Sequence, residues 1–250
     1  MSSDGILLSR ILPAFLAVVF FSCSVKENRD GCPCVLELEM HQMQAFPVEV
    51  AVWAEEFRDI REVDRDTTLR MIVPRPSVRV RAVHGTSVDA GDMLIPYGFD
   101  CPPLYLFDGE ADTSGETASV RVGLRKAYCA LTVTFSGPPG WEEPYALEII
   151  GNVNGYREDG SLSEGLFACR LSGSGTVCLP RQRDDSLRMD VILQDNKVRT
   201  FALGAYIASS GYDWSSPDLQ DLTLEIDLSV TQITFQIDLW SETIPLEIVI

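Results

Sequence analysis

The sequence predicts an all-β protein made of two antiparallel β-sandwich domains in tandem, and three observations support this fold class. Apolar residues recur at every second position through most of the chain, which is the periodicity of strands with one face on a core. Turn-forming clusters such as Gly137–Gly140 separate these runs. Helical periodicity is scarce. At about 100 residues per sandwich, a chain of 250 residues accommodates two such domains.

The chain contains six runs of alternating apolar residues up to Phe135, and each predicts a strand with one polar face. They are Leu36–Met40, Val48–Val52, Leu69–Val73, Val78–Arg81, Val120–Leu124 and Leu131–Phe135. The charged stretch Glu55–Arg65 is ambiguous, because Phe57, Ile60 and Val63 are spaced by three. That spacing allows either a short helical turn or a strand-loop-strand arrangement.

The C-terminal third shows the alternation more clearly. Its apolar faces run through Leu187–Leu193, Leu222–Val230, Ile233–Leu239 and Ile244–Ile250. The apolar phase changes by one residue at Thr231–Gln232, which indicates either a turn or a β-bulge. Pro245 favours an edge position for the last strand, because proline has no backbone N–H to donate to a neighbouring strand.

The turn-rich stretch Gly151–Gly165 is the expected domain boundary. Together with the N-terminal signals described next, it predicts four parts: residues 1–22 as a signal peptide, 23–31 as a polar lipidated tether, 32–157 as an N-terminal β-sandwich and 158–250 as a C-terminal β-sandwich.

The N-terminus has the pattern of a bacterial lipoprotein signal. Arg10 precedes the apolar run Ile11–Phe21, which is followed by the small residue Ser22 and by Cys23. The run is shorter than the about 20 apolar residues that a membrane-spanning helix needs, so it is typical of a removable signal segment. Cys23 is therefore the expected lipid attachment site, and fatty acyl chains on it would tether the exported protein to a membrane.

The charge and the motifs exclude several functions. The chain has 20 Lys and Arg against 37 Asp and Glu, a formal net charge of −17, which disfavours nucleic-acid binding. No nucleophile-elbow, zinc-protease or phosphate-loop pattern occurs, so we expect no enzyme activity, no cofactor and no metal site. Tyr212 and Trp214, in a Gly- and Ser-rich loop, are the candidate contacts for a glycan or a partner, with packing against the core as the alternative.

Six cysteines remain if Cys23 carries lipid, and an even number in an exported chain suggests disulfides. The stretch Cys169–Cys178 is symmetric about Gly173-Ser174, so a two-residue hairpin turn there would place Cys169 opposite Cys178. We therefore predict a disulfide between these two residues. The pairing of the other four, Cys32, Cys34, Cys101 and Cys129, stays open.

The segment from Cys23 to Leu38, which reads CSVKENRDGCPCVLEL, resembles the start of the fimbrial anchor lipoproteins of Bacteroidota, the subunits that fix type V fimbriae to the outer membrane. In that family the lipid-bearing Cys is followed by an Asp-x-Cys-Pro motif, here Asp30–Pro33, and by a first strand. Weaker similarities are Ile95–Gly98, Leu104–Phe107, Val120–Val133, Asn154–Tyr156 and Trp240.

The resemblance implies two transthyretin-like β-sandwiches and an outer-membrane protein that holds a polymer, with pilin subunits as partners bound through sandwich edges. Which pilin is bound, whether a donor strand is given or received, and whether the protein faces the cell surface or the periplasm stay open. The alternative function is a surface glycan-binding lipoprotein of a nutrient-uptake system, with Trp214 as its main ligand contact.

Overall fold

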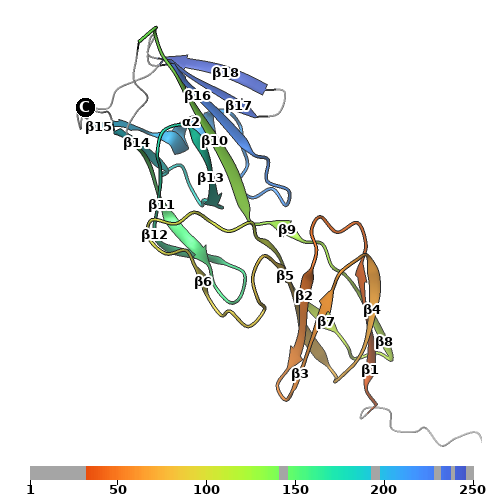
Figure 1. Ribbon diagram of the computed structural model, residues 1–250. Coiled ribbons are helices and arrows are strands. Elements are labelled where there is room, and N and C mark those ends of the chain that lie inside the picture. The colour runs from red at the N-terminus through yellow and green to blue at the C-terminus, as the bar shows by residue number, and fades with distance from the viewer. Residues whose placement is uncertain (1–31, 141–145, 193–197, 228–231, 238–239, 246–250) are drawn as a thin grey trace, which may run out of the picture. The chain divides into compact units, whose positions relative to one another are not determined.

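The computed structural model in Figure 1 describes residues 32–140, 146–192, 198–227, 232–237 and 240–245. These residues form strands and one short helix, which confirms the predicted all-β class. Residues 34–250 form one compact unit. The predicted signal peptide, Cys23 and the tether lie outside the described residues. Within the described part, no helix is long and apolar enough to cross a membrane.

The first sandwich consists of two sheets. Its strands are β1 (Cys34–Met40), β2 (Val48–Ala54), β3 (Phe57–Val63), β4 (Thr67–Val73), β5 (Ser77–His84), β7 (Tyr105–Asp112), β8 (Thr117–Arg121) and β9 (Arg125–Lys126). One sheet has the order β4-β1-β8 and the other β3-β2-β5-β7-β9. Figure 1 shows β1 to β5 in red to yellow.

The alternation in the sequence becomes the core of this sandwich. In β1 the side chains of Cys34, Leu36, Leu38 and Met40 are fully buried, whereas Glu37 points to the polar face. They pack with apolar residues of β2, β4 and β5 in one continuous cluster. The run at Val120–Leu124 is only partly a strand, but Val122 and Leu124 still reach this core.

The ambiguous stretch Glu55–Arg65 forms a hairpin strand, not a helical turn. Phe57–Val63 of this stretch form β3, which pairs antiparallel with β2 from Val48 opposite Val63 to Ala54 opposite Phe57. Because β3 ends its sheet, its many charged side chains discourage pairing with other chains.

The second sandwich contains the remaining elements. They are β6 (Met93–Leu94), β10 (Tyr128–Ser136), β11 (Ala146–Tyr156), β12 (Leu162–Leu171), β13 (Gly175–Pro180), β14 (Arg188–Ile192), β15 (Val198–Phe201), α2 (Leu203–Ser209), β16 (Leu222–Asp227), β17 (Gln232–Ile237) and β18 (Trp240–Pro245). One sheet has the order β13-β10-β16-β17-β18, and the other β12-β11-β14-β15, with β6 added to β11.

The phase change near Thr231 falls between two separate strands. β16 and β17 are antiparallel neighbours, with Asp227 opposite Gln232. A hairpin, not a bulged single strand, therefore accounts for the apolar shift. β18 is the last strand of its sheet and ends at Pro245. Residues 246–250 of the predicted last strand lie outside the described residues.

Two of the strand pairs in the described part of the chain are parallel, which the alternation pattern does not reveal. β8 runs parallel to β1, and β16 runs parallel to β10. Each pair joins strands that lie far apart in the sequence, so each sandwich mixes one parallel pair with antiparallel ones.

The strand pairing places the change of sandwich between β9 and β10, upstream of the expected boundary at Gly151–Gly165. β11, which contains the first part of that stretch, is a central strand of the second sandwich.

The segment between β5 and β7 leaves the first sandwich and pairs with the second. Its β6 lies opposite Gly155 and Tyr156 of β11. Glycines allow the close approach at both ends: a Cβ on Gly85 would lie 2.1 Å from the carbonyl oxygen of Pro103, and one on Gly155 would lie 2.0 Å from that of Met93. Both glycines also have positive φ, which other residues rarely adopt.

Candidate functional site

A cleft of about 1130 Å³ contains both aromatic residues that the sequence singles out, Tyr212 and Trp214. It is slightly larger than the about 300–1000 Å³ typical of small-molecule pockets, so it suits an extended ligand. Its lining is Leu106–Asp108, Gly123, Arg125, Ala127, Tyr156, Asp159–Leu162, Arg181–Asp185, Gly204, Ala208 and Tyr212–Ser215.

The loop that carries the aromatic pair is shaped by local hydrogen bonds. Helix α2 ends before Gly211, whose φ of 79° is the left-handed conformation that commonly terminates helices. The Asp213 carboxylate then accepts hydrogen bonds from the backbone N–H of Ser215 at 2.8 Å and from its hydroxyl at 2.7 Å. These two bonds lower the pKa of Asp213, so the carboxylate stays charged at the mouth of the cleft.

Tyr212 and Trp214 form an edge-to-face pair with ring centroids 4.9 Å apart. The Tyr212 hydroxyl donates to the carbonyl oxygen of Gln220 at 2.7 Å, and burial raises the pKa of this phenol. Both rings are half-buried and pack against the core cluster of the second sandwich. The structure therefore brings the two predicted contact residues together. Each ring packs partly against the core and also lines the cleft.

Arg181, which the sequence analysis did not identify, fixes the position of this loop by hydrogen bonds to its backbone. Its guanidinium donates to the carbonyl oxygens of Lys126, of Trp214 at 2.7 Å and of Pro217 at 3.1 Å. The side chain is buried, and this desolvation lowers its pKa. A single Arg after a strand gives no sequence signal, because its partners are backbone carbonyls distant in the chain.

A half-buried ion pair supports the same region. Lys126 Nζ lies 2.7 Å from Asp221 Oδ1, and the same carboxylate accepts the backbone N–H of Ala130 at 2.8 Å. Lys126 Nζ also lies 4.8 Å from the centre of the Tyr128 ring, within the range of a cation–π interaction. These contacts fix the start of β10 against the start of β16.

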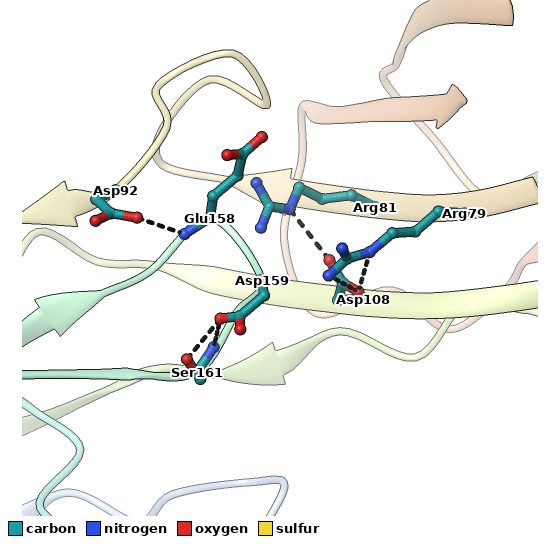
Figure 2. A network of polar contacts seen from close by, with 7 residues as sticks. All are labelled: Arg79, Arg81, Asp92, Asp108, Glu158, Asp159 and Ser161. Atoms are coloured by element: carbon teal, nitrogen blue, oxygen red, sulfur yellow. Dashed lines mark hydrogen bonds and ion pairs between the residues drawn. The ribbon is translucent and has the colours of Figure 1, made fainter. Parts of the chain in front are cut away.

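Figure 2 shows the polar residues near the opposite wall of the cleft. Asp108 on β7 accepts from Arg79 Nε at 3.0 Å and from Arg81 Nε at 3.3 Å. Asp159 accepts the backbone N–H and the hydroxyl of Ser161, and these bonds, helped by nearby arginines that include Arg79, lower its pKa. This wall therefore holds the carboxylates of Asp108 and Asp159 in a fixed arrangement.

A third contact in Figure 2 fixes the turn that carries Asp159. The backbone N–H of Glu158 donates to Asp92 Oδ1 at 2.8 Å. Asp92 lies just before β6, so this bond ties the excursion between β5 and β7 to the turn between β11 and β12.

The lining groups are suited to binding by hydrogen bonds and ring contacts. Carboxylates and guanidinium groups line the cleft together with the aromatic pair. Neither histidine lines the cleft: His41 contacts Thr68 Oγ1, and His84 Nδ1 contacts the carbonyl oxygen of Pro47. Among the described residues, no cluster of three or more His, Cys, Asp or Glu could hold a metal ion.

The hairpin expected around Gly173-Ser174 is wrong. Cys169 lies on β12 opposite Ile149, and Cys178 lies on β13 opposite Ala130, so the two residues belong to different sheets. The connection crosses from one sheet to the other because both strands bury apolar side chains in the shared core. Both residues carry free thiols, and burial raises the pKa of Cys169 to about 12. The disulfide between them stays a prediction.

The fold is shared with solved structures of Bacteroidota proteins. A candidate adhesin from Bacteroides thetaiotaomicron aligns with a TM-score of 0.60 at 14% identity, over 86% of this chain and 99% of that one. A candidate adhesin from Bacteroides ovatus aligns with a TM-score of 0.57 at 13% identity, over 88% and 97%. The fimbrial anchor protein Mfa2 from Porphyromonas gingivalis aligns with a TM-score of 0.54 at 13% identity, over 84% and 99%.

These likenesses agree with the resemblance found in the sequence, and at such identities they establish the fold. No protein-family model and no curated protein sequence matches the chain.

Proposed function

We propose that this protein is an outer-membrane lipoprotein that anchors fimbriae or helps to assemble them on the cell surface, with a structural and not a catalytic role. The observation that carries the proposal is the fold shared with a fimbrial anchor protein over 84% of this chain and 99% of that one. The lipoprotein-type signal ending at Cys23 supports it, because an anchor needs a stable attachment to the membrane.

The second sandwich offers a place for a pilin strand. Each of its two sheets has one end strand, β12 or β13, that is bonded to the β5–β7 connection. The N–H of Gly98 donates to the carbonyl of Ala168 on β12, and the N–H of Cys101 donates to the carbonyl of Cys178 on β13. The opposite ends are β15 and β18. An edge strand presents unpaired backbone groups to which an extended segment can add, and β15 begins with the exposed Val198.

Replacing Cys23 tests the anchor. The Cys23→Ala variant is expected to move from the membrane fraction to the medium and to release fimbriae with it, because no acyl chain can be attached. Cys32→Ala is the matched control, since Cys32 is an exposed thiol after the tether. Retention of Cys23→Ala in the membrane fraction, with fimbriae still attached, would contradict the proposal.

A photoreactive amino acid at position 198 tests the strand edge. With p-benzoylphenylalanine in place of Val198, we expect cross-links to a pilin subunit in intact cells. The same probe in place of Arg65, an exposed loop residue of the first sandwich, is the control. Equal cross-linking at both positions, or cross-links without pilins, would exclude β15 as the contact.

A second function is favoured by the cleft itself, whose aromatic pair and fixed carboxylates suit a polysaccharide. If the protein is a glycan-binding lipoprotein of a nutrient-uptake system, Trp214→Ala should abolish retention on a polysaccharide affinity gel. Tyr97→Ala, which removes an exposed aromatic ring outside the cleft, should leave retention unchanged. Absence of retention of the parent protein on a panel of host and dietary polysaccharides would remove this function.

A further inference from the structure

Exposed apolar side chains gather at one place on the second sandwich. Leu94, Tyr97 and Phe99 are 53%, 66% and 64% exposed within six consecutive residues. Leu166 on β12 is 59% exposed. It lies two residues before Ala168, and the carbonyl of Ala168 accepts a hydrogen bond from the N–H of Gly98. We call these four residues the 94–99 surface. Clusters of exposed apolar groups on a protein surface commonly mark interaction sites, whereas single ones do not.

The backbone beneath this surface is held at three points. Ile95 N–H donates to the carbonyl of Asn154, Gly98 N–H to that of Ala168 and Cys101 N–H to that of Cys178, each at 2.8 Å. Between them, a turn closes with the N–H of Phe99 donating to the carbonyl of Pro96, and Gly98 supplies the positive φ of 87°. Tyr97 therefore sits at the corner of a fixed turn, which reduces the ordering cost of binding.

A hollow of about 270 Å³ opens beside the surface. Its wall is mostly apolar and includes Met93, Leu94, Ile95, Pro96 and Leu104. The volume lies just below the about 300–1000 Å³ of typical small-molecule sites. Together with the flat aromatic groups next to it, the hollow suits one large side chain of a protein partner, since interface hot spots are apolar or aromatic side chains seated in such pockets.

The charges around the surface define the partner further. Asp92 and Asp100 line the hollow, and Glu148 accepts the hydroxyl of Tyr97 at 3.1 Å. Arg170, opposite Glu148 on β12, offsets one of the three negative charges. The local balance is negative, as it is for the whole chain at −17. A complementary partner therefore carries basic residues next to its apolar anchor.

We propose that the 94–99 surface and its hollow dock a protein segment in which a large apolar side chain is flanked by Lys or Arg. The partner's apolar side chain fills the hollow. Tyr97 and Phe99 contact the partner residues next to that side chain, and the partner's basic residues face Asp92 and Asp100. That the segment belongs to a fimbrial subunit rests on the proposed function. This docking surface includes neither β15 nor β18, and its hollow shares Tyr156 with the lining of the Tyr212–Trp214 cleft.

Cross-linking in the full-length, lipidated protein tests the surface. We would place p-benzoylphenylalanine at Tyr97 or Phe99 in the native host, and at Ile72 as the control. Ile72 is 69% exposed but lies on β4 of the first sandwich. After irradiation, mass spectrometry identifies the cross-linked peptide. We expect peptides from one subunit, at positions 97 and 99 only, with Leu, Ile, Phe or Trp next to a basic residue.

The second measurement compares binding of that subunit by the Tyr97→Ala/Phe99→Ala and Ile72→Ala variants. The double variant should bind at least about tenfold more weakly, as for hot-spot residues, and added salt should weaken binding of the parent. Because both removed side chains are exposed, the thermal unfolding midpoint should stay unchanged.

The outcomes separate this inference from the proposed function. Cross-links to an acidic segment, to a glycan, to lipid or to a second copy of this chain would overturn the docking proposal, and so would equal cross-linking at Ile72. If Cys23→Ala releases fimbriae while the double variant binds normally, the anchor function stands and the docking surface is wrong. If the double variant loses a non-fimbrial partner with the predicted segment, the surface stands and the anchor function is wrong.

Discussion

The Arg181 guanidinium donates from Nη1 to the carbonyl oxygen of Trp214 at 2.7 Å, so a buried cation determines where the aromatic loop of the cleft lies. The same group donates to the carbonyls of Lys126 and Pro217, which come from β9 and from the loop before β16. Because Trp214 lies in that same loop, one side chain after β13 holds two segments that are far apart in the sequence.

Arg181→Met should destabilise the protein by about 2–4 kcal/mol, because it leaves buried carbonyl oxygens without donors at about 1–3 kcal/mol each, partly relieved by relaxation. The loop at Trp214 should also loosen, which tryptophan fluorescence and near-UV circular dichroism would report. Urea unfolding gives the free energy. Arg183→Met is the control: Arg183 is half-exposed and pairs with Glu164, and its loss should cost less than about 1 kcal/mol. Equal costs for both variants would contradict this role of Arg181.

Tyr156→Phe should cost about 1–3 kcal/mol although it removes a single oxygen. The Tyr156 hydroxyl donates to the carbonyl of Ala127 and accepts the backbone N–H of Arg181 at 3.1 Å, and the residue is 3% exposed. The Phe variant leaves a buried donor and a buried acceptor unpaired. Tyr97→Phe, which removes an exposed hydroxyl, should change the unfolding free energy by less than about 0.5 kcal/mol. A neutral Tyr156→Phe would mean that water satisfies both groups.

Gly155→Ala should detach β6 from β11. The new Cβ would lie 2.0 Å from the carbonyl oxygen of Met93, and the φ of 142° is unfavourable for alanine. We expect a loss of at least about 2 kcal/mol and faster hydrogen exchange at the amide of Ile95, which is bonded to Asn154. Gly123→Ala is the control, because no atom lies within 4 Å of its added methyl group. Unchanged exchange at Ile95 in Gly155→Ala would refute the close approach.

The Asp184 carboxylate should contribute to stability at neutral pH and lose that contribution in acid. Hydrogen bonds from Ser186, and then from the Asn152 amide, lower its pKa below the ordinary value of about 3.9. The charged form is therefore favoured by folding, so the stabilisation is complete above about pH 4 and disappears as pH falls through the lowered pKa. An NMR titration of the carboxyl carbon gives this pKa.

In the same experiment, Asp184→Asn should lose less stability than the parent between pH 5 and pH 2. Asp64→Asn removes one negative charge from an exposed site and serves as the control. A midpoint for Asp184 at or above about 3.9 would contradict the prediction.

The strands with regular alternation could be predicted from the sequence, because a residue facing a core must be apolar whatever strand lies beside it. β1, β2, β4, β10 and β16 follow this pattern. Helix α2 could not: it spans seven residues, Ala202 at its N-cap makes no side-chain hydrogen bond, and no acidic residue lies in its first turn. Packing of Leu203 and Ile207 in the core holds it in place. A segment this short is not stable as an isolated helix.

The candidate site was predicted in part. Tyr212 and Trp214 were identified because aromatic residues in a polar loop are unusual, and the structure places both in one cleft. The hairpin between Cys169 and Cys178 was wrong because local symmetry cannot show that a connection crosses between two sheets. Arg181 was missed for a similar reason, since its partners are carbonyls that only the fold brings near.

The sequence by itself determined the all-β class and the acidic character of the chain and predicted a lipoprotein signal at Cys23, because periodicity, segment length and charge are local or additive properties. The tertiary structure alone decided which strands pair in parallel, that residues 93–101 bond to β12 and β13 at two sheet ends of the second sandwich, and that the exposed Leu94 lines a hollow. These features depend on contacts between distant residues, and backbone hydrogen bonds that make such contacts leave no mark in the identity of the side chains.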